Sequence, residues 1–360
     1  MCTDHGQPPL SGTVLHEVEI AETIALPAVD SVELVSLVDN VTDALMPDQG
    51  AARRVVLGSG PARAVATMVE GTAPDALIAE HGFSMLVTVR TGPVSHRFLF
   101  DTGTSPDGMT GNMRRLGIDP GTIEAVVLSH GHFDHTAGLD GLIRTLGQAN
   151  MPLVLHPHAW RRRRMVLPGR EPREMPTPSR RALAEAGFEL LETPRPSFLF
   201  GGSVLITGEV GRVTGYEAGF PPQQAWLDGQ WLPDPLVLDD QALVINVKDK
   251  GLLVLTGCGH AGIVNICRHA RALTGGEIPL HGAVGGFHLS GPLVEPLIPR
   301  VIDDLAALDP QLIVPAHCTR WRAQHAMARR FGETFIPNSV GTRFALLPAR
   351  VLRLTVPAVR

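Results

Sequence analysis

The sequence predicts a fold of the α/β or α+β class that combines mixed β-sheets with helices. Short apolar runs rich in β-branched residues recur from Val32 onward and are bounded by Gly, Pro or Asp, as strands commonly are. Helical patterns separate many of these runs. The composition, with 44% hydrophobic and 19% charged residues and a formal net charge of −5, is that of a globular chain long enough for one large domain or two medium ones.

The expected elements can be placed along the chain by these patterns. We expect strands at 33–38, 84–89, 97–100, 125–129, 153–156, 203–207, 242–247, 251–257, 282–287, 311–317 and 343–347. We expect helices at 136–147, 179–187, 261–275, 296–309 and 319–332. Strands and helices alternate, but some strands follow one another directly, so the sheets should be mixed.

The chain is expected to fold as one main domain, residues 32–360, after a weakly patterned segment at 1–31. Two stretches interrupt the pattern and are expected to be loop insertions. Residues 157–181 hold eight arginines and several prolines, and residues 215–235 are rich in Pro and Gly and carry two of the four tryptophans. Loops of this length are often lids or binding elements.

Composition also narrows the class of protein. The mild acidity disfavours nucleic acid as a partner, because domains that bind it usually carry a basic excess. No apolar run reaches the roughly 18 residues of a membrane helix, and the first residues show no secretory pattern. Four cysteines in 360 residues do not form a disulfide framework. We therefore expect a cytoplasmic protein with reduced thiols.

The stretch LSHGHFDHTAGL, residues 128–139, places three histidines and an aspartate after an apolar strand. His130 and His132 are two residues apart, so in extended backbone both imidazoles point the same way and can bind one cation. Asp134 and His135 follow in the turn and can face a second position beside the first. Imidazole nitrogen and carboxylate oxygen are ligands that zinc and similar ions favour. The stretch therefore predicts a metal site.

In this context HGHFDH resembles the HxHxDH signature of the metallo-β-lactamase superfamily, and FLFDTGTSP (98–106) is similar to its Asp-Thr-Gly motif. Further stretches resemble the superfamily-II metal-dependent hydrolases, some of which are dihydropterin ribofuranosyl-aminobenzene phosphate synthase-like proteins. These stretches are LVDN (37–40), EHGFSMLV (80–87), DDQALVI (239–245), TGCGHAGIVN (256–265), GGFHL (285–289) and PAHCT (315–319). The resemblance covers about residues 32–319 and implies an αββα sandwich with the metals at one sheet edge.

The resemblance implies a role for each matching residue. Asp101 would orient metal ligands without binding the metal, while His130, His132, Asp134, His135 and His317 would be ligands. The chain departs from the pattern at TGCGH, where Cys258 stands in place of the usual aspartate. Either Cys258 or His260 could complete the ligand set. We favour His260, because imidazole suits several divalent metals whereas thiolate restricts the choice.

Two further residues remain candidates near the site. His288 could be a ligand or a catalytic group that contacts substrate. Glu209 could stand where the family has its third histidine, and we rank it low. The expected cofactor is one or two divalent ions, zinc foremost, with iron or manganese as alternatives. With Asp134 as ligand and catalytic group, such a site would activate water against an ester, lactone or phosphoester-type substrate, including a pterin-linked one.

The two insertions supply candidate substrate contacts. Arg161 and Arg164 could clamp an anionic small molecule, although arginine runs are more often solvated and paired, here with Glu171 and Glu174. Trp226 and Trp231 could line a pocket for a flat substrate or anchor a long loop. Two other functions stay open: an iron-dependent oxidoreductase such as a sulfur dioxygenase, and a non-catalytic metal-binding sensor. The sequence does not determine the oligomeric state.

Overall fold

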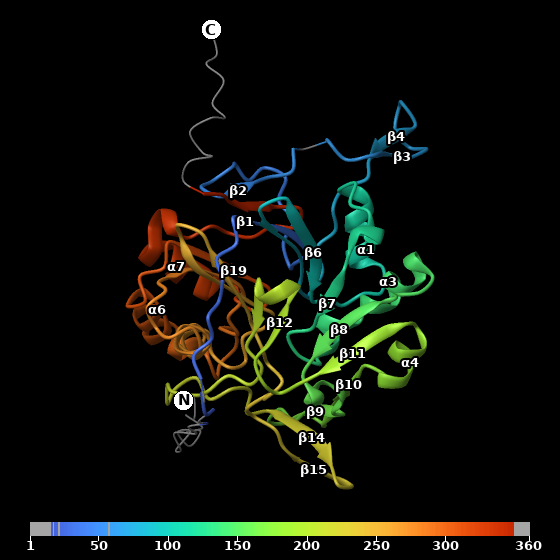
Figure 1. Ribbon diagram of the computed structural model, residues 1–360. Coiled ribbons are helices and arrows are strands. Elements are labelled where there is room, and N and C mark those ends of the chain that lie inside the picture. The colour runs from blue at the N-terminus through green and yellow to red at the C-terminus, as the bar shows by residue number, and fades with distance from the viewer. Residues whose placement is uncertain (1–15, 17, 21, 57, 349–360) are drawn as a thin grey trace, which may run out of the picture.

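Two large β-sheets pack face to face with helices on both outer sides in the computed structural model, which describes residues 16, 18–20, 22–56 and 58–348 (Figure 1). The first sheet has the order β11 (Phe188–Glu192), β8 (Met151–Leu155), β7 (Ala125–Val127), β6 (Val94–Phe100), β5 (Ser84–Thr91), β1 (Ser31–Val38), β20 (Arg343–Leu346) and β2 (Ala52–Arg53). The second has the order β12 (Ser197–Leu199), β13 (Val204–Ile206), β16 (Leu243–Val247), β17 (Gly251–Thr256), β18 (Leu280–Gly286) and β19 (Leu312–Ala316). The expected αββα sandwich is confirmed.

The helices form the outer layers. α1 (Gly108–Arg115), α3 (Leu139–Leu146) and α4 (Arg180–Glu185) accompany the first sheet, while α5 (Ile263–Leu273), α6 (Ile298–Ala306) and α7 (Trp321–Phe331) accompany the second. The short α2 (Phe133–Thr136) lies within the HGHFDH turn. Local signals set the ends: the Ser179 hydroxyl accepts the Ala182 N–H at the start of α4, and Gly147, at φ 76°, ends α3.

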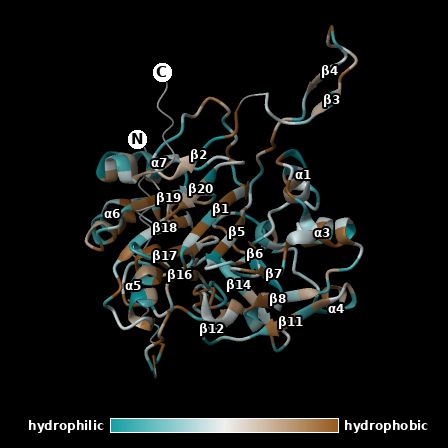
Figure 2. Ribbon diagram, turned by 45° about the horizontal axis from the view of Figure 1, so that its top comes forward, coloured by the Kyte–Doolittle hydropathy of each residue, from teal (hydrophilic) through white to brown (hydrophobic). Residues whose placement is uncertain are grey.

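The apolar core is divided into three layers. Met85, Val87 and Val89 of β5 face the layer between the sheets, whereas Leu86 faces the layer under α1 and α3. The same alternation in the second sheet separates the inter-sheet layer from the layer under α5, α6 and α7. Because both faces of each sheet are covered, the central strands are hydrophobic almost throughout, as the brown strands in Figure 2 show.

Each sheet is parallel in the part that carries the candidate ligands. In the first sheet β6, β7, β8 and β11 run parallel to one another, and in the second sheet β17, β18 and β19 do so. Parallel neighbours bring their carboxyl ends to one edge of a sheet. Residues that directly follow these strands are therefore gathered, although they are far apart in the sequence.

The prediction that residues 157–181 and 215–235 are loops is wrong, because together they form a small four-stranded sheet. Its order is β10 (Arg173–Met175), β9 (Arg163–Met165), β14 (Gln223–Leu227) and β15 (Gln230–Pro233). β9 pairs with β14 across some 60 residues of chain, with Arg164 opposite Gln224. The four strands are only three to five residues long, so no apolar alternation marks them and only the pairing reveals them.

Two regions lie at the margins of the sandwich. The hairpin of β3 (Ala62–Ala64) and β4 (Thr72–Pro74) projects from the body at the upper right of Figure 1. Of the weakly patterned segment 1–31, residues 1–15 lie outside the described part, and Val29 pairs with Val247 as an isolated bridge before β1 begins.

A single domain over 32–360 stays a prediction. Among the described helices, none combines the length and apolar character needed to cross a membrane.

Candidate metal centre

The predicted ligands gather where the parallel strands of both sheets end. Asp101 follows β6, residues 130–135 follow β7, Cys258 and His260 follow β17, His288 follows β18 and His317 follows β19. Asp101, His288 and His317 have positive φ angles of 60°, 47° and 49°. Residues other than glycine rarely adopt this conformation, and it is concentrated at functional sites. The backbone is therefore in the left-handed conformation at three of the strand ends that form the site.

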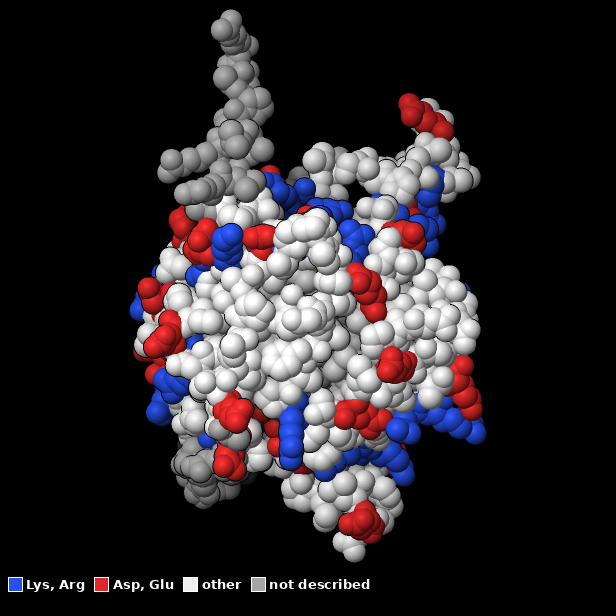
Figure 3. All heavy atoms as spheres, in the orientation of Figure 1, with Lys and Arg blue, Asp and Glu red and all other residues white. Residues whose placement is uncertain are grey.

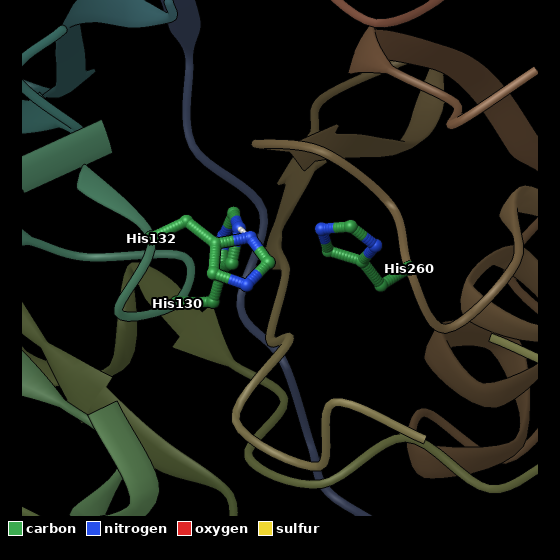
Figure 4. A group of neighbouring side chains, drawn as sticks. All are labelled: His130, His132 and His260. Carbon is green, nitrogen blue, oxygen red and sulfur yellow. Dashed lines mark hydrogen bonds between the residues drawn. The ribbon is translucent and has the colours of Figure 1, made fainter. Parts of the chain in front are cut away.

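His130, His132 and His260 form the first half of the site. Each offers a ring nitrogen, and the three nitrogens lie within 4.8 Å of one another (Figure 4). All three side chains are buried. Burial lowers the pKa of His130 and of His260 well below 6.5, and burial together with Arg163 lowers that of His132 to about 4. All three imidazoles are therefore neutral at pH 7, the form that binds a metal.

Hydrogen bonds fix which nitrogens of His130 and His132 carry protons. The Ser129 hydroxyl lies 2.7 Å from Asp101 Oδ2 and donates to it, so at 2.9 Å it accepts from His130 Nδ1. The Gln223 amide donates to Asp234, so its Oε1 accepts from His132 Nε2 at 2.6 Å. Each ring then turns a lone pair inward, and these two nitrogens lie 2.9 Å apart. A cation between or beside them removes the repulsion of two facing lone pairs, so the residues fit a bound metal.

Asp134, His135, His317 and Cys258 form the second half of the site. Asp134 Oδ2 lies 3.4 Å from His317 Nε2 and 3.8 Å from His135 Nε2. His135 Nδ1 is bound to Asp101 Oδ2 at 2.7 Å, which turns Nε2 toward Asp134. Within the described chain, His135 Nε2 and both ring nitrogens of His317 are buried without a hydrogen-bond partner. Buried polar atoms are rarely left so, and a metal ion is a partner that suits them.

Charge distinguishes the second half from the first. Burial would lower the pKa of His135, but the carboxylates of Asp101 and Asp134 raise it to about 9. Burial would likewise raise the pKa of Asp134, but His135 and His317 hold it well below 3.8. Without metal, His135 is an imidazolium beside two carboxylates at neutral pH. A cation bound to Asp134 and His135 would take the place of that proton.

Cys258 and His260 were expected to be alternatives for one ligand position, but they lie in different parts of the site. His260 joins the first half, and both of its ring nitrogens are buried without a partner among the described residues. Cys258 Sγ lies within 4.8 Å of a ring nitrogen of His130 and one of His135, at the junction of the two halves. The two residues can therefore serve together. That either binds metal stays a prediction.

His288 and Glu209 differ in their relation to this centre. His288 Nδ1 is 3.6 Å from Cys258 Sγ, and its ring centroid is 4.3 Å from that of His260, so it remains a candidate beside the site. Glu209 instead contacts His156 Nε2 at 3.3 Å. Three ring nitrogens of the neighbouring imidazoles have partners, since His156 Nδ1 accepts a backbone N–H, His156 Nε2 contacts Glu209 and His158 Nε2 accepts from Arg161, whereas His158 Nδ1 is buried without one among the described residues. This second histidine cluster is a hydrogen-bonded network.

The sequence did not single out His81, which lies at the opening of the site. Its Nε2 is 3.6 Å from Asp134 Oδ2, and its ring centroid is 4.8 Å from that of His317. A cavity of about 370 Å³ adjoins the two rings, and Arg320 and Trp321 contribute to its walls. His81 belongs to the stretch EHGFSMLV, but no local signal separates it from an ordinary loop histidine, because its partners lie more than 50 residues away.

The arginine-rich insertion supports the site through Arg163, which was not singled out either. Arg163 is buried and its guanidinium donates to Asp239, and Asp239 Oδ2 accepts the Gly131 N–H at 2.8 Å. Through Asp239, Arg163 thereby holds Gly131, the backbone position between His130 and His132. Arg162 pairs with Glu174 at 3.1 Å, and the basic atoms over the small sheet, low in Figure 3, are flanked by acidic ones. Arg162 is thus a solvated arginine paired with a glutamate, as arginine runs usually are, whereas Arg163 is buried.

Of the proposed substrate contacts, Arg164, Trp226 and Trp231 lie together on the small sheet, whereas Arg161 lies apart from them. Trp226 and Trp231 are cross-strand partners with ring centroids 5.2 Å apart, and Arg164 lies over Trp231 at 4.6 Å. Arg161 pairs with Asp234 at 3.3 Å. Alternation along β14 puts Trp226 on the face opposite Gln223, the residue that contacts His132. A substrate role for these four residues stays a prediction.

Comparison with known proteins gives consistent results. The model of the metallo-beta-lactamase superfamily matches residues 79–194. A Methanocaldococcus jannaschii protein named 7,8-dihydropterin-6-methyl-4-(beta-D-ribofuranosyl)-aminobenzene-5'-phosphate synthase is 29% identical over 232 residues, which cover 62% of this chain and 76% of that protein. An uncharacterized protein of the same organism, MJ0448, is 31% identical over 202 residues, covering 55% of this chain and 70% of that protein.

A solved structure has a similar fold. It is that of Tm1679, described as a metal-dependent hydrolase of the beta-lactamase superfamily, and it superposes with a TM-score of 0.65 over 88% of this chain and all of that chain. The sequences are 23% identical, so this likeness concerns the fold alone.

Proposed function

This chain belongs to the metallo-beta-lactamase superfamily, and from that premise we propose that it is a metal-dependent hydrolase of a small molecule. The first half of the site would hold one divalent ion through His130, His132 and His260. The second half, Asp134, His135, His317 and Cys258, would hold another. Zinc fits this mixture of imidazole, carboxylate and thiolate donors best, and iron fits it next.

The inward lone pairs of His130 and His132 carry this proposal. Their two nitrogens face each other at 2.9 Å in neutral, buried imidazoles whose outer nitrogens are already hydrogen-bonded. A structural histidine pair would instead place a proton between two such nitrogens. Here Ser129 and Gln223 hold the protons on the outer side, so the pair is prepared for a cation.

The residues around the two halves would have different chemical tasks. A bound divalent metal lowers the pKa of a coordinated water to about 7 and polarises an ester or phosphoester oxygen. Asp134, kept ionised by the imidazoles around it, would accept a hydrogen bond from the attacking water and orient it. Ser129, Asp101 and Gln223 keep the imidazoles in fixed tautomers, and the outer partners of ligands strongly influence metal affinity. His288 would contact the substrate or complete the ligand set.

The cavity beside His81 and His317 is a candidate place for substrate, with Arg320 available to an anionic group and the carboxylates of Asp39 and Glu80 also in its wall. Arg320 lines it, and Trp321 is 60% exposed. α7 begins at Trp321 in the wall of this cavity, and the free N–H groups of its first turn add positive potential. The relative named as a synthase points to dihydropterins and ribofuranosyl-aminobenzene phosphates as compounds to test beside simple esters, lactones and phosphoesters.

Metal analysis with matched variants tests the proposal. We expect His130→Ala and His132→Ala to lose bound metal and turnover together. His96→Ala is the control. His96 lies near the beginning of β6, away from the strand end that leads to Asp101, and it pairs with Glu124. Full metal occupancy in either site variant would contradict the ligand assignment. Iron with oxygen consumption would favour the oxidoreductase, and metal without turnover on the whole panel would favour the sensor.

A further inference from the structure

Two cysteines meet at the edge of the second half of the site. Cys258 follows β17 and Cys318 follows β19, and β18 lies between these strands in the sheet. Neighbouring strands are about 4.8 Å apart, so residues two strands apart are ordinarily separated by about 10 Å. The two Sγ atoms are nevertheless only 3.0 Å apart. Both cysteines are free and buried.

Glycine at the end of β18 makes this approach possible. A Cβ at Gly286 would lie 2.8 Å from Cys318 Sγ and 2.3 Å from the Gly257 carbonyl oxygen, so any side chain there would occupy the space in which the sulfurs meet. The backbone then holds Cys318 in place: its Sγ accepts the His288 N–H at 3.2 Å and lies 3.1 Å from the Cys258 carbonyl oxygen. The two thiols are thus positioned by the fold rather than brought together by chance motion.

We propose that Cys258 and Cys318 form a redox-active dithiol, which a peroxide converts to an intramolecular disulfide. One thiol sulfur attacks a peroxide oxygen, the O–O bond breaks, and a sulfenic acid and one molecule of water result. The second thiol attacks the sulfenic sulfur, forms the S–S bond and releases a second water. Each sulfur loses one electron and the peroxide gains two. A disulfide bond is about 2.05 Å long, so the sulfurs need to approach by about 1 Å.

The consequence for the metal centre rests on the proposed function. Cys258 is the donor at the junction with His130 and His135, and Cys318 directly follows His317. A sulfur in a disulfide no longer offers a thiolate to a metal. Oxidation should therefore weaken the second half and spare the first, where the donors are His130, His132 and His260.

The chain contains its own control thiol. Cys267 lies on α5 in the core layer beneath the helices and is 0% exposed, whereas Cys258 and Cys318 are 5% and 8% exposed. A peroxide can therefore reach the pair at the site more readily than it can reach Cys267. Selective oxidation of the pair would reflect its position rather than general sensitivity of buried cysteines.

Peptide mapping of the full chain tests the proposal. The protein is treated with hydrogen peroxide, its free thiols are alkylated under denaturing conditions, and the non-reduced digest is analysed by mass spectrometry. We expect a peptide pair linked through Cys258 and Cys318, with Cys267 recovered alkylated, and full reversal by dithiothreitol. Cys318→Ser and Cys318→Ala should abolish the link, and Cys267→Ser should retain it. Recovery of Cys258 and Cys318 as free thiols or as separate sulfinic acids would overturn the proposal.

Metal content is measured on the same samples. We expect peroxide to remove about one ion per chain from loaded protein and dithiothreitol with fresh metal to restore it. A disulfide that forms without any loss of metal would overturn the proposed control of the site. Reduced protein that binds no metal would instead be a failure of the proposed hydrolase function, and the disulfide would still be measurable in it.

Discussion

Metal binding should depend on pH through the second half of the site alone. His130, His132 and His260 are neutral at pH 7, because burial lowers the pKa of each below 6.5. His135 is protonated at that pH, because Asp101 and Asp134 raise its pKa to about 9. Its Nε2 must lose a proton before it can bind a cation. The ion in the second half therefore competes with a proton, and the ion in the first half does not.

The size of the effect follows from this pKa. With a value of about 9, about one His135 in a hundred is neutral at pH 7 and half are neutral at pH 9. Deprotonation of His135 by itself should thus raise the affinity for the second ion about 50-fold over this interval, or about 2.3 kcal/mol. The metal-free protein should show the opposite trend. A raised histidine pKa stabilises the fold below 6.5, and that stability is lost as the pH rises toward 9.

Calorimetric titration in two buffers of different ionisation enthalpy measures the proton directly. We expect about two protons released with the second ion at pH 7, one from His135 and one from the Cys258 thiol, whose pKa burial raises, and none from the histidines of the first half. Asp101→Asn removes the charge that raises the pKa of His135, so the pH dependence should flatten while affinity at pH 9 falls by roughly 10-fold to 100-fold. Asp140→Asn, on the exposed side of α3, is the control. Equal affinity for the second ion at pH 7 and pH 9 would refute the reasoning.

Two further predictions concern stability. Arg163→Met should lower the free energy of unfolding in urea by roughly 3–5 kcal/mol, because it leaves Asp239 as a buried carboxylate without its arginine partner. An unchanged midpoint and slope of the urea transition would contradict this. His269→Gln should lessen acid sensitivity, because burial and Arg212 lower the pKa of His269 to about 4, so that stability is lost as pH falls from about 6.5 toward 4. Relative to wild type, this variant should gain about 2.5 kcal/mol between pH 7.5 and pH 4.5, and a parallel pH profile for the two proteins would count against it.

The fold and the central motif could be predicted from local patterns. The strands that form the core are nearly continuous apolar runs, and the expected helices fall within a few residues of α3 to α7. α1 was missed, because the sequence GMTGNMRR holds two glycines and little apolar character. The spacing of His130 and His132 sets their common direction by strand geometry, so two of the three donors of the first half were visible in six residues.

The small sheet was hidden for a different reason. β9 and β14 are short and polar, and each is stabilised by pairing with the other rather than by its own pattern. The sequence showed only an excess of arginine and proline, which is typical of loops. Arg163 could not be separated from its neighbours, because its burial depends on Asp239, 76 residues along the chain.

The sequence by itself determined the strands and helices of a mixed α/β fold and the histidines of the HGHFDH turn, because both depend on periodicity within a few residues; the αββα sandwich was implied by the resemblance to the family. Tertiary structure decided what completes the site. It separated His260 from Cys258, brought His81 to the opening, turned His132 inward through Gln223 and placed Cys318 against Cys258. These contacts join strand ends that only the pairing of parallel strands and the stacking of two sheets bring together. Spacing along the chain carries no information about such distances.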